Sequence, residues 1–286
     1  MENTIVGIGE ILWDIFPGGK ELGGAPANFA YHTSLFGFNS VVISAIGNDI
    51  LGDEIVDLLA QKRVKSNIKR VEFPTGTVQV TLDSIGIPSY EIKKDVAWDN
   101  IPFDNNLLQL ALQTRAVCFG SLAQRNEVSK VTINRFLDAM SNDKTYKIFD
   151  INLRQNFYNK AIIENSIQKC NVLKLNDEEL TVVAAMFGYG NGLIEKNCQK
   201  LLYDFNLKIL ILTCGTEGSY IFSEEGISFL ETPVVKVADS VGAGDAFTAA
   251  FCASILKGKS ISVAHKKAVE VSAFVCTQDG AMPELL

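Results

Sequence analysis

Short apolar runs alternate along the chain with longer segments of helical periodicity. The run Thr4–Ile8 is rich in β-branched residues and is followed by Gly9, as is typical of a buried strand. The segment Asp49–Lys62 instead repeats its apolar residues on one helical face. This alternation predicts an α/β protein with a mainly parallel central sheet that is covered by helices on both faces. Further strands are predicted at Val41–Ile46, Ala116–Gly120, Tyr146–Asp150, Val172–Leu175 and Leu207–Thr213, with a hairpin at Ser219–Phe222 and Ile227–Leu230. Further helices are predicted from Pro26 to about Gly37, at Asn106–Gln113 and Glu127–Ser141, after Asn176 as far as Met186, and at Ala246–Leu256 and Val263–Cys276.

The rhythm changes between Ile68 and Lys94. Thr77–Asp83 alternates polar and apolar residues, Gly86–Ser89 has the composition of a turn, and Tyr90–Ile92 returns to a strand pattern. This predicts an antiparallel hairpin inserted into the α/β chain. A small sheet with one apolar face needs something to cover, so we expect either a lid over the active site or a homodimer contact.

Composition narrows the function classes. The chain has 286 residues and a net charge of −7, which argues against a nucleic acid or an anionic membrane as the main partner. No apolar run approaches the length of a membrane span, and no signal peptide is recognised. The six cysteines are scattered without a C-x-x-C pair, which predicts free thiols in a reducing cytoplasm. With only two histidines, a histidine-based metal site or catalytic triad is not expected.

Polar clusters follow several of the predicted strands. They contain Asp14, Asp150–Arg154, Asn176–Glu179, Thr213–Gly218 and Asp239–Asp245. The carboxyl ends of parallel strands lie at one edge of a sheet, where ligands bind, so these clusters predict a single binding cleft.

The cluster Asp239–Phe247 carries the most specific chemistry. Its Gly242-Ala243-Gly244 turn opens a helix, and such a turn leaves backbone N–H groups free to bind a phosphate. Asp245 follows in the first helical turn, where it is suited to accept a proton from a hydroxyl that attacks phosphorus. The alternative is a tight turn in which Asp245 only favours the helix start. There is no Walker-type G-x-x-x-x-G-K-[S/T] run, and Gly7-Ile8-Gly9 lacks the third glycine of a dinucleotide fingerprint.

Two segments together resemble the signatures of the ribokinase-like (PfkB) carbohydrate kinases. They are Gly23–Asn28 near the start and Asp239–Phe247 near the end. The Gly-Gly-Ala-Pro-Ala-Asn variant, with Val96–Asp99 and Phe149–Arg154, is most similar to the bacterial fructokinase branch. The resemblance implies one kinase domain over residues 1–286, with a three-layer α/β/α fold and a small β lid formed mainly by about 12–23 and 68–98.

The resemblance also implies a role for individual residues. It makes Asp245 the catalytic base, with the amides of Gly242, Ala243 and Gly244 as its anion hole. It assigns sugar hydroxyls to Asp14, Gly24 and Asn28, while Arg154 suits a phosphate clamp. It assigns the nucleotide to Asn176, Glu179, Thr213, Gly215 and Gly218. It links Glu179 to Mg²⁺ through water and Asp239, with carbonyls near Gly280, to K⁺.

The implied activity is transfer of the γ-phosphoryl group of ATP to the primary hydroxyl of a free hexose, D-fructose. Ala25 stands where ribokinases carry lysine, which disfavours ribose, and Ser240 replaces the usual threonine. Kinases of 2-keto-3-deoxygluconate, adenosine or a phosphosugar stay as alternatives, as does a non-catalytic sugar- or nucleotide-binding regulator. An anionic substrate would need basic side chains near the lid to bind its charge. The candidates are Lys93, Lys94, Arg125 and Arg154. Trp98 and Asp99 are expected to close the lid, and His32 to lie on a helix face.

Overall fold

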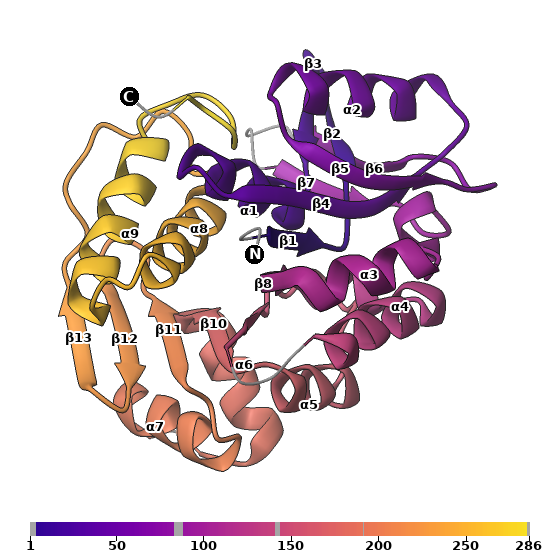
Figure 1. Cartoon of the computed structure of the whole chain (residues 1–286). Coiled ribbons are helices and arrows are strands. Elements are labelled where there is room, and N and C mark those ends of the chain that lie inside the picture. The colour runs from indigo at the N-terminus through magenta and orange to yellow at the C-terminus, as the bar shows by residue number, and fades with distance from the viewer. Residues whose placement is uncertain (1–3, 83–87, 141–143, 191, 285–286) are drawn as a thin grey trace.

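Two β-sheets organise the protein. The computed structural model describes residues 4–82, 88–140, 144–190 and 192–284. In this part of the chain the larger sheet comprises β1 (Thr4–Ile8), β4 (Asn39–Ile46), β5 (Lys65–Arg70), β8 (Thr114–Phe119), β9 (Tyr146–Asp150), β10 (Val172–Asn176), β11 (Ile209–Thr213), β12 (Ser219–Ser223) and β13 (Gly226–Leu230). Their order is β13-β12-β11-β10-β9-β8-β1-β4-β5 (Figure 1). Neighbours from β11 to β5 are parallel, and β12 and β13 form an antiparallel hairpin at one edge.

Helices cover both faces of the large sheet, which confirms the predicted layered α/β architecture (Figure 1). Alternate residues of β1 show the two faces, because Ile8 packs toward one helical layer and Ile5 toward the other. The first layer comprises α3 (Asn105–Gln113), α4 (Glu127–Ala139), α5 (Lys160–Lys169), α6 (Asp177–Phe187) and α7 (Ile194–Asp204). The second comprises α1 (Ala25–Leu35), α2 (Ile50–Gln61), α8 (Ala243–Leu256) and α9 (Ile261–Val275).

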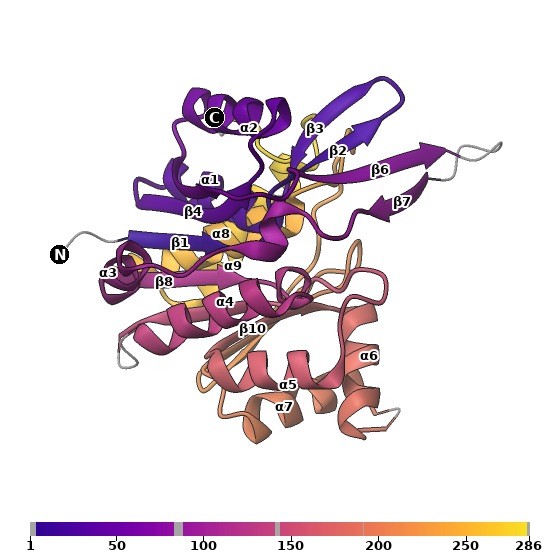
Figure 2. The same ribbon diagram turned by 90° about the vertical axis from the view of Figure 1, so that its right-hand side faces the viewer.

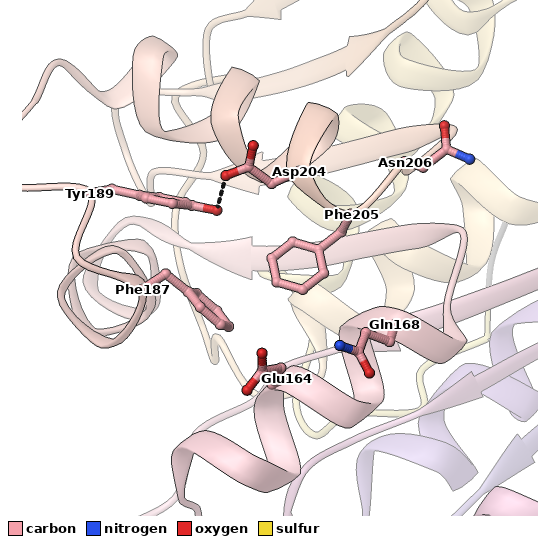
Figure 3. Close-up of a pocket in the computed structure, with 7 residues that line it drawn as sticks. All are labelled: Glu164, Gln168, Phe187, Tyr189, Asp204, Phe205 and Asn206. Carbon is pink, nitrogen blue, oxygen red and sulfur yellow. Dashed lines mark hydrogen bonds between the residues drawn. The ribbon is translucent and has the colours of Figure 1, made fainter.

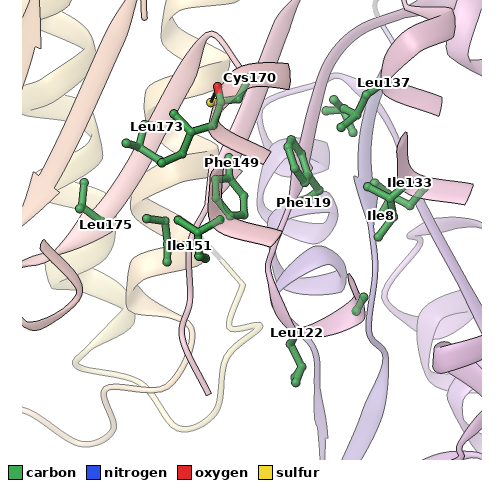
Figure 4. Packing of buried hydrophobic residues seen from close by; sticks show 14 of the residues in the cluster. Ile8, Phe119, Leu122, Ile133, Leu137, Phe149, Ile151, Cys170, Leu173 and Leu175 are labelled. Carbon is green, nitrogen blue, oxygen red and sulfur yellow. Dashed lines mark hydrogen bonds between the residues drawn. The ribbon is translucent and has the colours of Figure 1, made fainter. Parts of the chain in front are cut away.

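The largest apolar cluster fills the space between the sheet and the first layer. Phe119 of β8 and Phe149 of β9 stack there with ring centroids 5.1 Å apart. Ile133 and Leu137 of α4 lie over the same face (Figure 4). Phe119 and Phe149 come from apolar runs that the sequence predicts as strands, so burial of those runs stabilises the packing of α4 on the sheet.

A second sheet of four strands lies apart from the first. It contains β2 (Leu12–Phe16), β3 (Gly19–Gly23), β6 (Gly76–Leu82) and β7 (Pro88–Ile92), in the order β3-β2-β6-β7. Its two antiparallel hairpins extend beyond the large sheet (Figure 2), and β2 pairs with β6 in parallel. The hairpin predicted between Thr77 and Ile92 is therefore confirmed. Of the turn predicted at Gly86–Ser89, residues 86 and 87 lie outside those described, and Pro88 and Ser89 belong to β7 instead of the turn. The roles of this sheet as a lid or dimer contact stay predictions.

The lid boundary inferred from the sequence needs one correction. Ile68–Arg70 belongs to β5, which pairs in parallel with β4 in the large sheet. The second segment of the small sheet therefore begins at Gly76, eight residues after the start expected for the predicted lid. The strand Lys65–Arg70 is mostly polar because it lies at the edge of the sheet, where charged side chains reach solvent.

Two helices were also missing from the expected elements. α5 and α7 are mostly polar and bury only a narrow stripe each, such as Ile163 and Ile167 in α5 and Cys198 and Leu201 in α7. No helix of the described residues is long and apolar enough to cross a bilayer. The six cysteines are free thiols, as predicted, whereas a cytoplasmic location stays a prediction.

Candidate active site

The polar segments that follow the strands lie side by side at one edge of the large sheet. The register of β9 and β10 pairs Asp150 with Lys174, and that of β10 and β11 pairs Asn176 with Thr213. The strand pairing therefore brings these polar clusters together at the carboxyl edge of the sheet, as predicted.

The turn before α8 has a shape that requires glycine. Gly242 has a φ of +76°, and a Cβ built there would lie 2.6 Å from the Cβ of Ala281. The N–H of Ala243 donates to the carbonyl of Ser240 over 3.3 Å, while those of Gly242 and Gly244 meet no acceptor among the described residues. Free amides at the positive end of a helix dipole make this turn suited to an anion.

Asp245 lies in the first turn of α8 and is held by Asn28 of α1. The Asn28 Nδ2 donates to the Asp245 Oδ2 over 2.8 Å, and Asn28 is only 4% exposed. Burial and, to a lesser degree, the charge of Asp150 raise the pKa of Asp245 to about 6, against the lowering effects of the Asn28 hydrogen bond, Lys174 and Arg154. Such a carboxylate is ionised at neutral pH and still basic enough to accept a proton.

Two buried charged residues in the floor of this site have no role in the sequence-based prediction. Lys174 donates from Nζ to the Asp150 Oδ1 over 3.0 Å. Glu10 is 3% exposed, its Oε2 meets no partner among the described residues, and burial raises its pKa to about 7. The signals in the sequence are a lysine inside the apolar run of β10 and an acid two residues after β1, and both are weak without the fold.

Asp14 places a further carboxylate over this edge from the small sheet. Burial and, to a lesser degree, the charge of Glu21 on β3 raise the pKa of Asp14 to about 6, against the lowering effect of Arg154. Gly24 is the N-cap of α1 with a φ of +121°, and a Cβ there would lie 2.5 Å from the carbonyl oxygen of Glu10. Arg154 is exposed and takes part in none of the salt bridges between described residues. Its Nη1 donates to the Leu153 carbonyl over 3.1 Å, and the rest of its guanidinium is available to a ligand.

Asn176 and Glu179 form a capping box at the start of α6. The Asn176 Oδ1 accepts from the Glu179 N–H over 2.7 Å, and the Glu179 Oε2 accepts from the Asn176 N–H over 2.9 Å. The second oxygen of Glu179 accepts from the N–H of Leu153 over 2.8 Å. Glu179 therefore holds the loop after β9 against the end of β10 through hydrogen bonds. This structural role is separate from its predicted role at Mg²⁺.

Thr213, Gly215 and Gly218 belong to a tight connection between β11 and β12. The Cys214 N–H donates to the Gly218 carbonyl over 2.9 Å, and the Thr232 hydroxyl donates to the Gly215 carbonyl over 2.7 Å. Because Thr213 pairs with Asn176, this connection lies next to the start of α6. The residues predicted to bind nucleotide are thus adjacent, and their contact with nucleotide stays a prediction.

Asp239 links the turn before α8 to the last part of the chain. Its Oδ1 accepts from the Val241 N–H over 2.9 Å and its Oδ2 from the Gly280 N–H over 3.2 Å. His32 is buried on α1, as expected of a helix-face residue, and its Nε2 bonds the Ala281 carbonyl over 2.9 Å. The segments predicted to hold K⁺ are therefore in contact, while K⁺ itself stays a prediction.

Arg125 is not free to bind an anionic substrate. It makes a bidentate pair with Asp99, from Nε to Oδ1 over 2.7 Å and from Nη2 to Oδ2 over 2.8 Å. Its guanidinium carbon lies 4.0 Å from the ring centroid of Trp98 and 4.6 Å from that of Phe157. Trp98 is fully buried and packs against Gly76, so this cluster anchors the base of the small sheet.

A separate hollow lies at the other end of the strands. Its lining residues Gln168 and Asn206 come just before β10 and β11, opposite to the carboxyl edge. Figure 3 shows Tyr189 donating to Asp204 there, over 2.7 Å. Its described lining contains two carboxylates, from Glu164 and Asp204, and no basic side chain. The hollow therefore does not suit a nucleotide phosphate.

The fold and this edge together define a class of protein. A helix-covered parallel sheet with a free-amide turn at its carboxyl edge is typical of enzymes that handle phosphorylated ligands. The pfkB family carbohydrate kinase model matches residues 17–285. The chain belongs to this family, so the resemblance drawn from the two signatures is confirmed, together with the ribokinase-like fold.

Similar proteins include kinases of two kinds of sugar. The chain is 26% identical over 272 residues to an ATP-dependent 6-phosphofructokinase of Thermoanaerobacterium thermosaccharolyticum, covering 93% of this chain and 82% of that protein. It is 29% identical over 269 residues to a fructokinase of Klebsiella pneumoniae, covering 89% and 85%. Among solved structures, a double-mutant fructokinase of Vibrio cholerae in the fructose-, ADP- and potassium-bound form has a TM-score of 0.82 at 24% identity, covering 99% and 94%.

Proposed function

We propose that the protein is an ATP-dependent kinase of a free hexose, D-fructose, which it converts to fructose 6-phosphate. The observation that carries the proposal is the position of Asp245. Its carboxylate is oriented by Asn28 and lies one residue after Gly244, whose amide is free. A base beside an anion-binding turn is what transfer of a phosphoryl group to a hydroxyl needs.

In the proposed reaction the Asp245 carboxylate accepts the proton of the primary hydroxyl. The hydroxyl oxygen forms a bond to the γ-phosphorus of ATP, and the bond from this phosphorus to the oxygen that bridges the β- and γ-phosphates breaks, so that ADP leaves. The amides of Gly242 and Gly244 stabilise the charge on the transferred group, with Ala243 completing the turn. Asp14 and Gly24 face the sugar from the small sheet and the start of α1, and Asn28 holds the base.

The nucleotide and ions are proposed to bind at the same edge. Asn176, Thr213, Gly215 and Gly218 form the adjacent surface for ATP. Both oxygens of Glu179 already accept backbone N–H groups, so its fit to Mg²⁺ is through water, as that ion keeps much of its hydration shell. Mg²⁺ would neutralise charge on the phosphates. For K⁺, the acidic Asp239 beside Gly280 provides a carboxylate and nearby carbonyls, and the Vibrio cholerae relative holds a potassium ion.

Fructose is favoured over an anionic sugar by the state of the nearby cations. Arg125 is neutralised by Asp99, and Lys93 pairs with Glu91 over 2.7 Å. Fructokinases of bacteria and plants are among the similar proteins. A phosphosugar is the second candidate, because Arg154 stays available and one relative is a 6-phosphofructokinase.

A coupled assay of ADP formation tests the proposal on fructose, ribose, 2-keto-3-deoxygluconate, adenosine and fructose 6-phosphate. We expect fructose to give the highest kcat/KM of the panel. Turnover of fructose 6-phosphate alone would overturn the hexose assignment and keep the family. Binding of a sugar without turnover of any of them would support the non-catalytic regulator.

Arg154→Gln separates the two sugar candidates. If Arg154 clamps the transferred phosphoryl group, we expect kcat to fall about 10- to 100-fold with little change in the KM for fructose. If it binds a substrate phosphate, the KM for fructose 6-phosphate rises instead. Steady-state kinetics with both sugars measure this, and Arg135→Gln, which changes an exposed arginine on α4, is the matched control.

A further inference from the structure

A buried ion pair lies beneath the anion-binding turn and has no part in the roles described so far. Lys174 of β10 is 8% exposed and Asp150 of β9 is 3% exposed. Their Nζ and Oδ1 atoms are 3.0 Å apart. Burying two charges is costly, and a hydrophobic pair in the same place would often be as stable. The pair is therefore weak evidence for stability and invites a functional explanation.

The ammonium of Lys174 lies against the backbone of the turn itself. A Cβ built on Gly244 would be 3.3 Å from the Lys174 Nζ, which is the only atom within 4 Å of it among the described residues apart from its chain neighbours and the backbone of its own helix. The next residue along α8 is Asp245. A positive charge thus lies beside Gly244, in the turn whose amides are proposed to receive the phosphoryl group.

The electrostatic surroundings agree with this placement. Burial alone would lower the pKa of Lys174, but the carboxylates of Asp150, Glu179 and Asp245 outweigh burial and raise it, so Lys174 stays charged. Without this cation, three carboxylates would face the phosphates of ATP with little compensation, and their repulsion would be strong in a site of low dielectric.

We propose that Lys174 is a positioning residue of the phosphoryl-transfer site, held by Asp150, which keeps the Asp245 carboxylate ionised and supplies positive charge behind the Gly242–Gly244 turn. Asp150 and Lys174 act on Asp245 in opposite directions, because the anion disfavours its ionised form and the cation favours it. The expected loss of catalysis rests on the proposed function. The expected effect on the pKa of Asp245 can be measured in the free protein without any substrate.

Opposite shifts of one titration test the proposal. The Asp245 carboxyl is followed by ¹³C NMR in the free protein, with Asp245→Asn to assign the signal. We expect Lys174→Met to raise the pKa of Asp245 from its value of about 6 by about one unit, and Asp150→Asn to lower it. The charged groups around Asp245 that could also contribute are Arg154 in the loop after β9, Glu10 after β1 and Glu179 on α6.

Kinetics on the sugar that the wild type phosphorylates supply the second readout. The acid limb of kcat/KM against pH is expected to move up in Lys174→Met and down in Asp150→Asn, with kcat about 10- to 100-fold lower in the former. Lys174→Arg should restore part of kcat. Lys169→Met, which removes a cation paired with Asp138 far from this edge, should change neither readout.

The two readouts have separate failures. Shifts of equal sign, or no shift, in the NMR titration of folded variants would overturn the proposal whatever the substrate is. If Lys174→Met alone does not fold, the double variant with Asp150→Asn removes both charges, and the proposal then requires a lower kcat than in Asp150→Asn. Absence of turnover by the wild type on every sugar would count against the proposed function only, because the titration needs no substrate.

Discussion

Asp245→Asn is expected to lower kcat by about 10³-fold or more while the affinity for ATP changes by less than about twofold. An amide cannot accept the proton of the attacking hydroxyl, whereas the amides of the turn that face the phosphates stay in place. Asn28 can still donate to the remaining side-chain oxygen at position 245, so the local geometry should persist. Steady-state kinetics and calorimetric titration with ATP measure the two quantities.

The same substitution should not weaken the fold. The pKa of Asp245 in the folded protein is about 6, above its ordinary value of 3.8, so the folded state binds more protons near pH 5. Stability from this group is therefore lost as pH rises through about 4 to 6, and above pH 6 the folded protein carries the full cost of the buried charge. Asp245→Asn removes that cost, so its Tm at pH 8 should equal or exceed that of the wild type.

Asp57→Asn is the control for this pair of measurements. Asp57 is an exposed residue of α2 and makes no contribution to the site, so neither kcat nor Tm should change. A kcat for Asp245→Asn near that of the control would contradict the assignment of the base. A fall in Tm together with kcat would show damage to the fold rather than loss of a proton acceptor.

The sequence predicts those parts of the fold that the core determines. β1 and β11 are apolar almost throughout, and β9 and β10 are apolar runs interrupted by one lysine each, because both faces of the sheet are covered; their composition therefore reveals them as strands. The capping residue Asn176 is also visible in the sequence, because its side chain acts on a backbone N–H only three residues away. Features set by local hydrogen bonds or by burial of an apolar run can therefore be predicted directly from the sequence.

The features that the sequence does not display depend on contacts between distant segments. α5 and α7 carry too few apolar residues to stand out, and their place is set by packing on the sheet. Lys174 is a single lysine in an apolar strand, and it gains meaning only when the register pairs it with Asp150 and brings Gly244 over it. Likewise, nothing local tells that Arg125 is neutralised by Asp99, 26 residues away.

Gly242→Ala is expected to lower kcat at least about 100-fold, because it disturbs the turn that presents the free amides. The added methyl group would meet both the Cβ and the Cα of Ala281, at 2.6 and 2.8 Å, in a segment anchored through His32. The turn or that segment must then move. The φ of +76° adds strain of about 1–2 kcal/mol, which urea unfolding can measure.

Gly258→Ala isolates the effect of strain from the effect on the turn. Gly258 follows the other end of α8 with a φ of +74°, and a Cβ there would meet nothing within 4 Å. Both variants should therefore lose a similar free energy of unfolding from backbone strain, with an additional loss in Gly242→Ala from the collision with Ala281. Only Gly242→Ala should lose activity, since the amides of the turn are near position 242 alone. Equal activity in the two variants would mean that the geometry of this turn does not govern phosphoryl transfer.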